Sequence, residues 1–164
     1  MQFAHPAAVS LLRQAKSMPT DNKAVILVNA CDPANPFGPG INIPGWFGAE
    51  DALRINRLPG SWLAFRGGAL LTIIEGNGAR MRTSASPEEV RPALQQFLKL
   101  LLLPEHLRPF REIRIEHIDG NRPGESPLAE TLRSFGFERG RDQTMFIDAY
   151  ALRGIDNPPT SIFH

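Results

Sequence analysis

Runs of apolar residues, and their alternation with polar residues, predict several strands along the chain. Residues 24–30 are nearly all apolar and rich in β-branched side chains, so we expect a central strand that is covered on both faces. Residues 111–120 alternate strictly between apolar and polar positions, and Asp119-Gly120 closes this strand in a turn. Residues 144–150 predict a last strand.

The strongest helical signal lies between Ser86 and Pro104. Ser86 as the cap, Pro87 at the first helical position and Glu89 as the capping-box acid are typical of a helix start. One stripe at helical spacing is apolar: Val90, Leu94, Phe97, Leu98 and Leu101. Pro92 removes a backbone donor, so either the first turn is kinked or the main helix begins at Pro92, and Pro104 ends it.

Two shorter segments also have a helical pattern. Residues 6–18 carry apolar side chains at helical spacing behind Pro6, although both ends are weakly specified. Ser126 and Pro127 open a second helix, which Gly136 terminates.

The stretch "CDPANPFGPG" follows directly on the first strand, and its prolines and glycines must end that strand. Residues 31–51 show no periodicity and predict a long loop, which is either functional or packed by its own Phe37, Trp46 and Phe47. The stretch turns the chain rigidly out of the sheet, because each proline fixes φ.

Between residues 52 and 84, glycine-rich turns separate short apolar runs. This pattern predicts a meander of three or four antiparallel strands with breaks at Pro59-Gly60, Gly67-Gly68 and Gly76-Asn77-Gly78. Strict alternation groups Leu70 with Thr72 and Ile74 on one face, and neither face is clearly polar. We therefore expect the sheet to curl so that most of its surface is covered.

The order of these elements predicts an α+β fold. We expect a curled, mainly antiparallel sheet or a small β-barrel, flanked by two or three helices. Residues 1–22 form a helical lead-in that could be a winged-helix remnant, 23–150 the β-barrel-like domain, and 151–164 a mobile tail.

Composition narrows the class of protein only slightly. The chain has 164 residues, a net charge of +1 and one cysteine, Cys31. It is long enough for one domain with a core of its own, the charge demands neither nucleic acid nor a membrane, and the single cysteine excludes an internal disulfide. No apolar stretch approaches the roughly 20 residues of a membrane span, and the N-terminus does not resemble a secretory signal, so we expect a cytoplasmic protein.

The sequence contains no motif of a nucleotide-driven motor and no spacing typical of metal ligands. No P-loop signature is present, so we expect no ATPase motor in this chain. The four histidines are scattered without metal-ligand spacing, so we expect no metal and no cofactor.

Four polar residues in apolar or turn-rich surroundings are candidates for a site. Asp32 and Asn35 either cap the amides of their own loop or face a groove as a polar pair. Asp119 has the same ambiguity, with turn formation as its structural role. Asp148 interrupts the last strand, as an edge residue or as a catalytic carboxylate near DNA.

Several arginines lie at predicted turns or strand edges and could meet phosphates: Arg66, Arg80, Arg82, Arg139 and Arg141. They could equally protect strand edges from pairing between molecules. Trp46 could stack on a base or fill the core.

Three segments, taken in order, resemble one known module: "VILVNACDPANPFG", "RLPGSWLAFRGGALLTIIEGNGARM" and "IRIEHIDGNRPGESPLAETLRSFGF". Together they are similar to the C-terminal β-barrel module of the Lhr (large helicase-related) family of ATP-dependent DNA helicases. The resemblance covers about residues 24–140, and the third segment is its strongest part.

The resemblance implies a role in DNA repair, beside helicase motor domains in cis or in trans. The family's C-terminal region looks related to winged-helix DNA glycosylases, and uracil-glycosylase activity is attributed to some members. This chain lacks the motor motifs, so helicase activity cannot reside in it. Asp148 is the nearest candidate for the family's catalytic aspartate by position alone.

Three functions are compatible with these observations. The first is a non-motor accessory domain that binds DNA or assembles with a helicase. The second is a glycosylase-like enzyme acting on a flipped base. The third is a homo-oligomerisation domain without nucleic-acid contact.

Overall fold

The computed structural model of the chain describes residues 10, 13–14, 24–37 and 55–154. Ser10, Arg13 and Gln14 are helical, and the other residues of the helix expected over 6–18 lie outside the described residues. The rest of the lead-in, Trp46 with most of the loop around it, and the tail beyond residue 154 lie outside the described residues.

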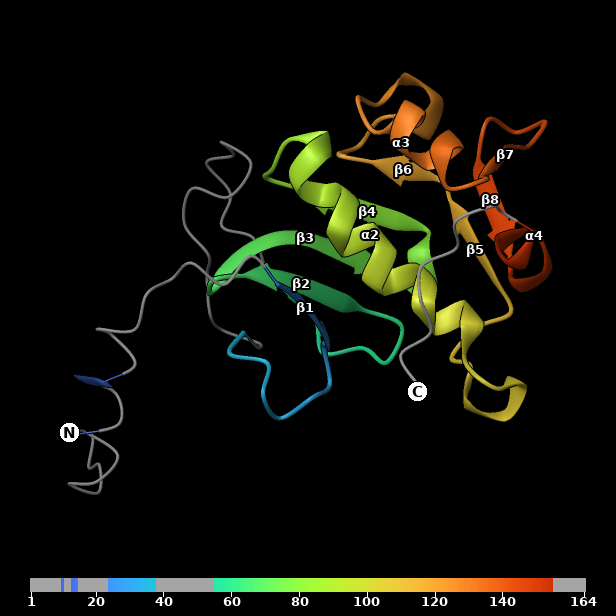
Figure 1. Ribbon diagram of the computed structural model, residues 1–164. Helices are drawn as coiled ribbons and strands as arrows, with labels where there is room; N and C mark the ends of the chain where they lie inside the picture. The colour runs from blue at the N-terminus through green and yellow to red at the C-terminus, as the bar shows by residue number, and fades with distance from the viewer. Residues whose placement is uncertain (1–9, 11–12, 15–23, 38–54, 155–164) are drawn as a thin grey trace.

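A five-stranded sheet forms the larger part of the fold (Figure 1). Its strands, in spatial order, are β1 (Val25–Asn29), β2 (Trp62–Arg66), β3 (Ala69–Glu75), β4 (Arg80–Thr83) and β6 (His117–Ile118). The first four are antiparallel, whereas β6 pairs parallel to β4. The predicted meander is confirmed for β2 to β4, while β1 reaches β2 only across the long loop.

A second, antiparallel sheet has three strands, which lie in the order β5 (Glu112–Ile115), β8 (Met145–Asp148) and β7 (Glu138–Arg139). The sequence predicts one strand over 111–120, but the structure divides this segment between the two sheets. The N–H groups of Glu116 and His117 both donate to the carbonyl of Ala79, at 2.8 and 3.1 Å, which turns the chain from one sheet into the other.

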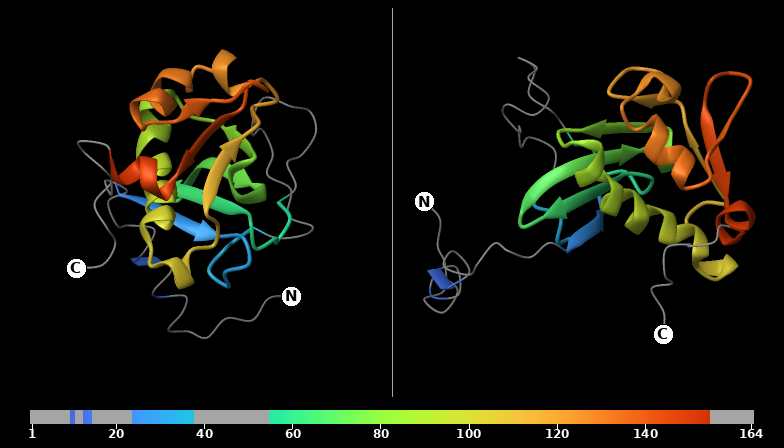
Figure 2. Two further views of the ribbon diagram at one scale, coloured as in Figure 1. Left: turned by 90° about the vertical axis from the view of Figure 1, so that its right-hand side faces the viewer. Right: turned by 45° about the horizontal axis from the view of Figure 1, so that its top comes forward.

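Helix α2 (Pro87–Leu102) packs against β1 and β3 and contacts α4, and Figures 1 and 2 show it along one face of the five-stranded sheet. It begins where the capping signal predicts, with the Glu89 carboxylate accepting from the N–H of Ser86 at 3.1 Å. Pro92 lies inside the helix, which continues through it. Pro92 therefore removes one backbone hydrogen bond from the helix, but the helix still begins at Pro87.

Two short helices complete the described fold: α3 (Ala129–Ser134) and α4 (Ala149–Arg153). Before α3, the hydroxyl of Ser126 accepts from the N–H of Leu128 at 3.2 Å, and Gly136, with φ of +82°, follows the helix end as expected. Single 3-10 turns span Gly76–Gly78, Glu105–Leu107 and Pro123–Glu125. The strand expected over 144–150 ends at Asp148, and the start of the expected tail belongs to α4.

The main core lies where α2, α3 and α4 meet the two sheets. Its largest fully buried side chains include Phe97, Leu98, Ile113, Ile118 and Leu132. A smaller cluster covers the opposite face of the five-stranded sheet, where Ile55, Leu63 and Ile73 pack with Phe37 and Phe65. Strands β2 and β3 therefore carry packed apolar side chains on both faces, as their apolar pattern requires.

A β-bulge in β3 makes one sequence prediction wrong, namely that Leu70 lies on the same face of the sheet as Thr72 and Ile74. Ala64 pairs with Thr72 but Phe65 pairs with Leu70, so Leu71 is an extra residue in β3. Leu71 packs with Ala64 on the α2 side, and Leu70 turns to the opposite face.

Strand β1 lies at the edge of the sheet and not at its centre. In the described part of the chain its one neighbour is β2, and Ile26 is 58% exposed. The expected α+β class with a curled, mainly antiparallel sheet is confirmed. The described strands do not close into a barrel, because β1 and β6 remain at opposite edges.

Candidate functional site

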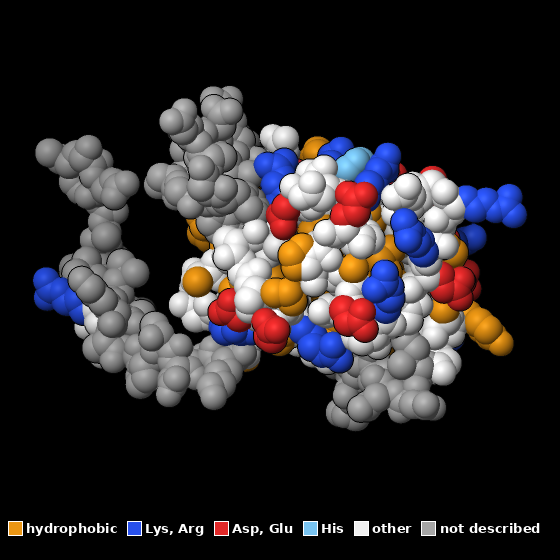
Figure 3. All heavy atoms as spheres, turned by 90° about the horizontal axis from the view of Figure 1, so that it is seen from above, with side chains coloured by type: hydrophobic (Ala, Val, Ile, Leu, Met, Phe, Trp, Pro, Cys, Tyr) orange, Lys and Arg blue, Asp and Glu red, His pale blue; other side chains and the backbone are white. Residues whose placement is uncertain are grey.

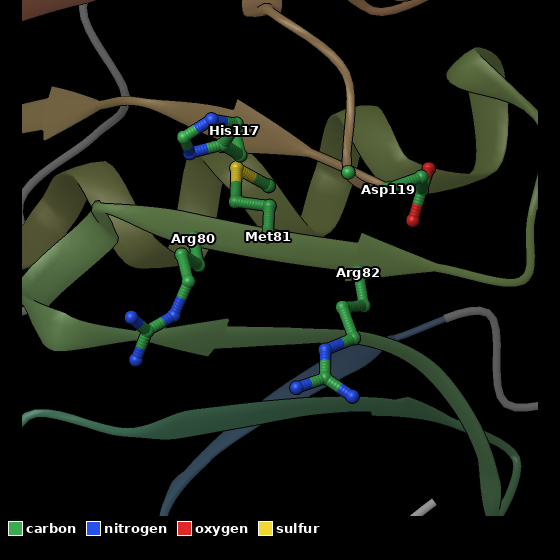
Figure 4. A pocket seen from close by; sticks show the side chains of 6 residues that line it. Arg80, Met81, Arg82, His117 and Asp119 are labelled. Atoms are coloured by element: carbon green, nitrogen blue, oxygen red, sulfur yellow. The ribbon is translucent and has the colours of Figure 1, made fainter. Parts of the chain in front are cut away.

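A hollow of about 480 Å³ opens beside the parallel pair of β4 and β6 (Figure 4). Its described lining residues are Arg80, Met81, Arg82, His117, Asp119 and Gly120. The described lining thus includes two cationic side chains, an imidazole and a carboxylate. Polar groups that converge on a concave surface are typical of a binding site.

The alternation of β4 places its two arginines at the surface. Successive side chains of a strand point to opposite faces, so Met81 enters the core, where it is 2% exposed. Figure 4 shows Arg80 and Arg82 extending from β4 in the same direction. Their side chains are 62% and 42% exposed.

One carboxylate serves both arginines. An Nη2 of Arg82 lies 3.2 Å and the Nε of Arg80 3.8 Å from the same Oε2 of Glu75, whose side chain is 13% exposed. Exposed pairs of this kind stabilise a fold by about 0–1 kcal/mol. One negative charge against two positive charges leaves the pair with capacity for an anion.

Asp119 occupies a tight turn at the end of β6. Asp119 and Gly120 both have positive φ, +52° and +81°, and the N–H of Asn121 donates to the carbonyl of Ile118. The carboxylate Oδ1 accepts from the N–H of Thr83 at 2.8 Å, so this side chain also ties β6 to the end of β4. The expected turn role is confirmed.

Partial burial of the Asp119 carboxyl raises its pKa above the ordinary value. The hydrogen bond from Thr83 and the charge of Arg82 act in the opposite direction, because both favour the carboxylate.

His117 is a residue of the hollow that sequence reasoning missed. It pairs with Arg80 in the parallel register of β6 and β4 and is half-buried. The only local signal is its alternation with Asp119 across the buried Ile118. Nothing in the sequence indicates that this short segment pairs with β4.

The other arginines predicted to bind nucleic acid do not line the hollow. Arg66 donates to the backbone carbonyl of Glu89, at the start of α2, at 3.0 Å. Arg139 lies on β7 and donates to Gln143 at 3.4 Å, and Arg141 is exposed on the connection to β8. Trp46 lies outside the described residues.

Asp32 and Asn35 stabilise their own loop. Oδ1 of Asp32 accepts from the N–H of Ala34 at 2.8 Å, which is an Asx turn. Asn35 is 2% exposed, accepts from the N–H of Phe37 and donates to the carbonyl of Ala30. The loop-capping alternative therefore describes both side chains.

Asp148 is the N-cap of α4. Its Oδ1 accepts from the N–H groups of Tyr150 and Ala151, at 2.8 and 2.7 Å. The residue interrupts the apolar run because the strand ends there and a helix begins.

We expect Asp148→Ala to lower the free energy of unfolding by about 1 kcal/mol, because two helix N–H groups lose their acceptor. Asp148→Asn should stay within a few tenths of the wild type, since asparagine caps equally well. Urea denaturation followed by circular dichroism measures both. An equal loss in the two variants would contradict the capping role.

A second hollow, of about 340 Å³, lies over the outer face of β1 and β2. Its described lining residues carry no charge: Ile26, Val28, Ala34, Pro36, Phe65 and Gly68. One of these lining residues, Phe65, stacks on Phe37, with ring centroids 5.9 Å apart. The edge of the sheet is therefore apolar where it is most exposed.

The described residues limit the other kinds of site. No helix among them is long and apolar enough to cross a membrane. The same part of the chain brings no three metal-ligating side chains (His, Cys, Asp or Glu) together. On the face drawn in Figure 3, Lys and Arg side chains of the described part alternate with Asp and Glu side chains. Because charges of both signs are mixed on that face, the binding of an anion there would depend on a local group of cationic side chains.

Comparisons of the chain with protein-family models, curated proteins and solved structures found no match.

Proposed function

We propose that the chain is a non-motor accessory domain that binds nucleic acid, like the C-terminal module of the Lhr-type DNA helicases that it resembles, and serves DNA repair. The observation that carries this proposal is the exposed pair of Arg80 and Arg82 on one side of β4, at the rim of a hollow. Phosphate contacts by such side chains supply most of the affinity of non-specific binding.

The spacing of the pair suits a phosphate backbone. Alternate residues of a strand lie about 7 Å apart, so two guanidinium groups can contact different phosphate groups. Glu75 holds both arginines on the same side without neutralising them fully. A preordered pair loses less side-chain entropy when it binds.

Base excision by this chain has less support. The Asp148 carboxylate accepts two helix N–H groups, which is sufficient reason for an aspartate at this position. Removal of uracil from an oligonucleotide by the wild type, and its loss in Asp148→Asn, would favour the enzyme over the accessory domain.

Assembly is a second candidate function, favoured by the apolar edge at β1. Exposed edge strands pair with other chains unless charges or proline protect them, and β1 carries no charged residue. The concentration dependence of the sedimentation coefficient tests this candidate directly.

The expected result of Arg80→Ala/Arg82→Ala is a loss of about tenfold or more in affinity for a single-stranded oligonucleotide at low salt. Each lost phosphate contact should also reduce the slope of log K against log salt concentration by about 0.7–0.9. Fluorescence anisotropy between 20 and about 200 mM salt measures both quantities.

The matched control is Arg111→Ala/Arg133→Ala, which removes the same charge from exposed positions on other elements. It should change the affinity and the slope much less than the β4 variant does. Equal losses in the two double variants would show that net charge matters and that the β4 site does not.

A further inference from the structure

We infer that the hollow beside β4 and β6 takes one unstacked guanine base of a single-stranded nucleic acid, and that Asp119 forms hydrogen bonds that select this base. This inference rests on the proposed function, because it assigns the base to the same site whose arginines would hold the phosphates.

The size and the walls of the hollow suit a base. About 480 Å³ is within the range of ligand pockets and leaves room for a purine. The lining also includes the imidazole of His117, a group that stacks on unpaired bases. A base within a duplex cannot enter, because its faces are already stacked.

Asp119 determines which base fits. Its Oδ1 already accepts from Thr83, and no donor from the described residues binds Oδ2. An ionised carboxylate only accepts hydrogen bonds. Guanine is the one base with two adjacent donors, N1–H and N2–H₂, on its Watson–Crick edge, whereas the other bases place an acceptor beside each donor there. Those acceptor atoms carry partial negative charge, so the carboxylate of Asp119 would repel them.

The fold holds Asp119 in place for this contact. Its positive φ and the following Gly120 fix the turn, and the bond to Thr83 fixes the side chain. The positive charge of Arg82 favours the carboxylate form, against the larger effect of burial, which raises the pKa of Asp119. A preordered acceptor loses little free energy on binding and can therefore select between bases.

The experiment compares three ligands by fluorescence anisotropy: d(GTT)₄, d(ITT)₄, in which inosine lacks only the N2 amino group, and d(GTT)₄ annealed to its complement. We expect the wild type to bind the guanine strand about five- to tenfold more tightly than the inosine strand, as expected when one of two hydrogen bonds to a base is lost. The duplex should bind more weakly than the single guanine strand.

Asp119→Asn tests the assigned residue. Asparagine tolerates positive φ and retains an acceptor for Thr83, but it places an amide donor or a neutral oxygen against the base. The preference for guanine over inosine should disappear in this variant and persist in Asp142→Asn, which removes the same charge from an exposed turn. If Asp119→Asn failed to fold, the comparison of guanine with inosine in the wild type would still test whether the site prefers guanine.

The outcomes separate this inference from the proposed function. Salt-dependent binding with equal affinity for guanine and inosine, or equal affinity for duplex and single strand, would overturn the guanine assignment and leave the proposed function standing. Persistence of the preference in Asp119→Asn would overturn the role of Asp119. If no ligand bound at low salt, the proposed function and the inference would fall together.

Discussion

Phe97→Ala is expected to lower the free energy of unfolding by about 3–5 kcal/mol, the usual cost of deleting a large buried ring. Phe97 is 1% exposed, on the face of α2 that packs into the core. Its ring meets the Trp62 ring edge-on, at a centroid distance of 6.4 Å, and the Phe110 ring at 5.2 Å. Removal of the ring therefore opens a cavity where α2, β2 and the segment before β5 meet.

Urea denaturation at neutral pH measures this loss, and Leu107→Ala is its control. Leu107 is also apolar, but it is 52% exposed in a 3-10 turn, so its truncation should change stability by no more than about 0.5 kcal/mol. Similar small effects in the two variants would show that Phe97 is not part of a close-packed core.

Gly78→Ala should destabilise the protein by about 3 kcal/mol, for two separate reasons. Gly78 is buried with φ of +110°, a conformation that side chains rarely adopt. In addition, an added Cβ would lie 2.7 Å from the Cγ2 of Ile113, a fully buried residue of β5. Ile113 cannot move away without disturbing its packing, so the steric clash adds to the backbone strain.

Gly68→Ala separates the two contributions. Gly68 has φ of +85° in the β2–β3 hairpin, but an added Cβ there would meet nothing within 4 Å. It should cost only about 1 kcal/mol, which is the backbone strain alone. Thermal or urea unfolding of both variants gives the difference. Equal costs would mean that Ile113 yields, and that the contact with β5 is not tight.

Signals that are local in the sequence predict local structure well. Ser86, Pro87 and Glu89 indicate the start of α2 correctly, because each acts on a backbone group within the first turn of the helix. Asp32 and Asn35 bind amides two residues ahead, and Asp119-Gly120 adopts the turn that such a pair favours. These interactions need no knowledge of the rest of the chain.

Features that depend on contacts between residues far apart in the sequence could not be predicted from it. The apolar run at β1 has the pattern of a central strand, but its place at the sheet edge depends on the partners that the other strands take. Asp148 follows an apolar strand pattern, and only the start of α4 shows that it is a cap. The strand ends and the helix begins at Asp148, inside one largely apolar run of the sequence.

The candidate site is the clearest case of a non-local feature. Arg80 and Arg82 are evident as arginines near a turn, but Asp119 reaches Thr83 across 36 positions of sequence. The pairing that creates the hollow involves only two residues of β6. No periodicity can be detected in so short a strand, so the sequence predicts the individual side chains and misses their association.

The division of residues 112–118 between two sheets has a consequence for how the domain can be dissected. Ile113 and Ile115 belong to one sheet and Ile118 to the other, yet all three enter the same core. A fragment that ends after α2 would leave β4 without its parallel neighbour, and a fragment that starts at β5 would expose the apolar side chains that α2 now covers. We therefore expect neither half to fold alone, and the two sheets to unfold as one cooperative block.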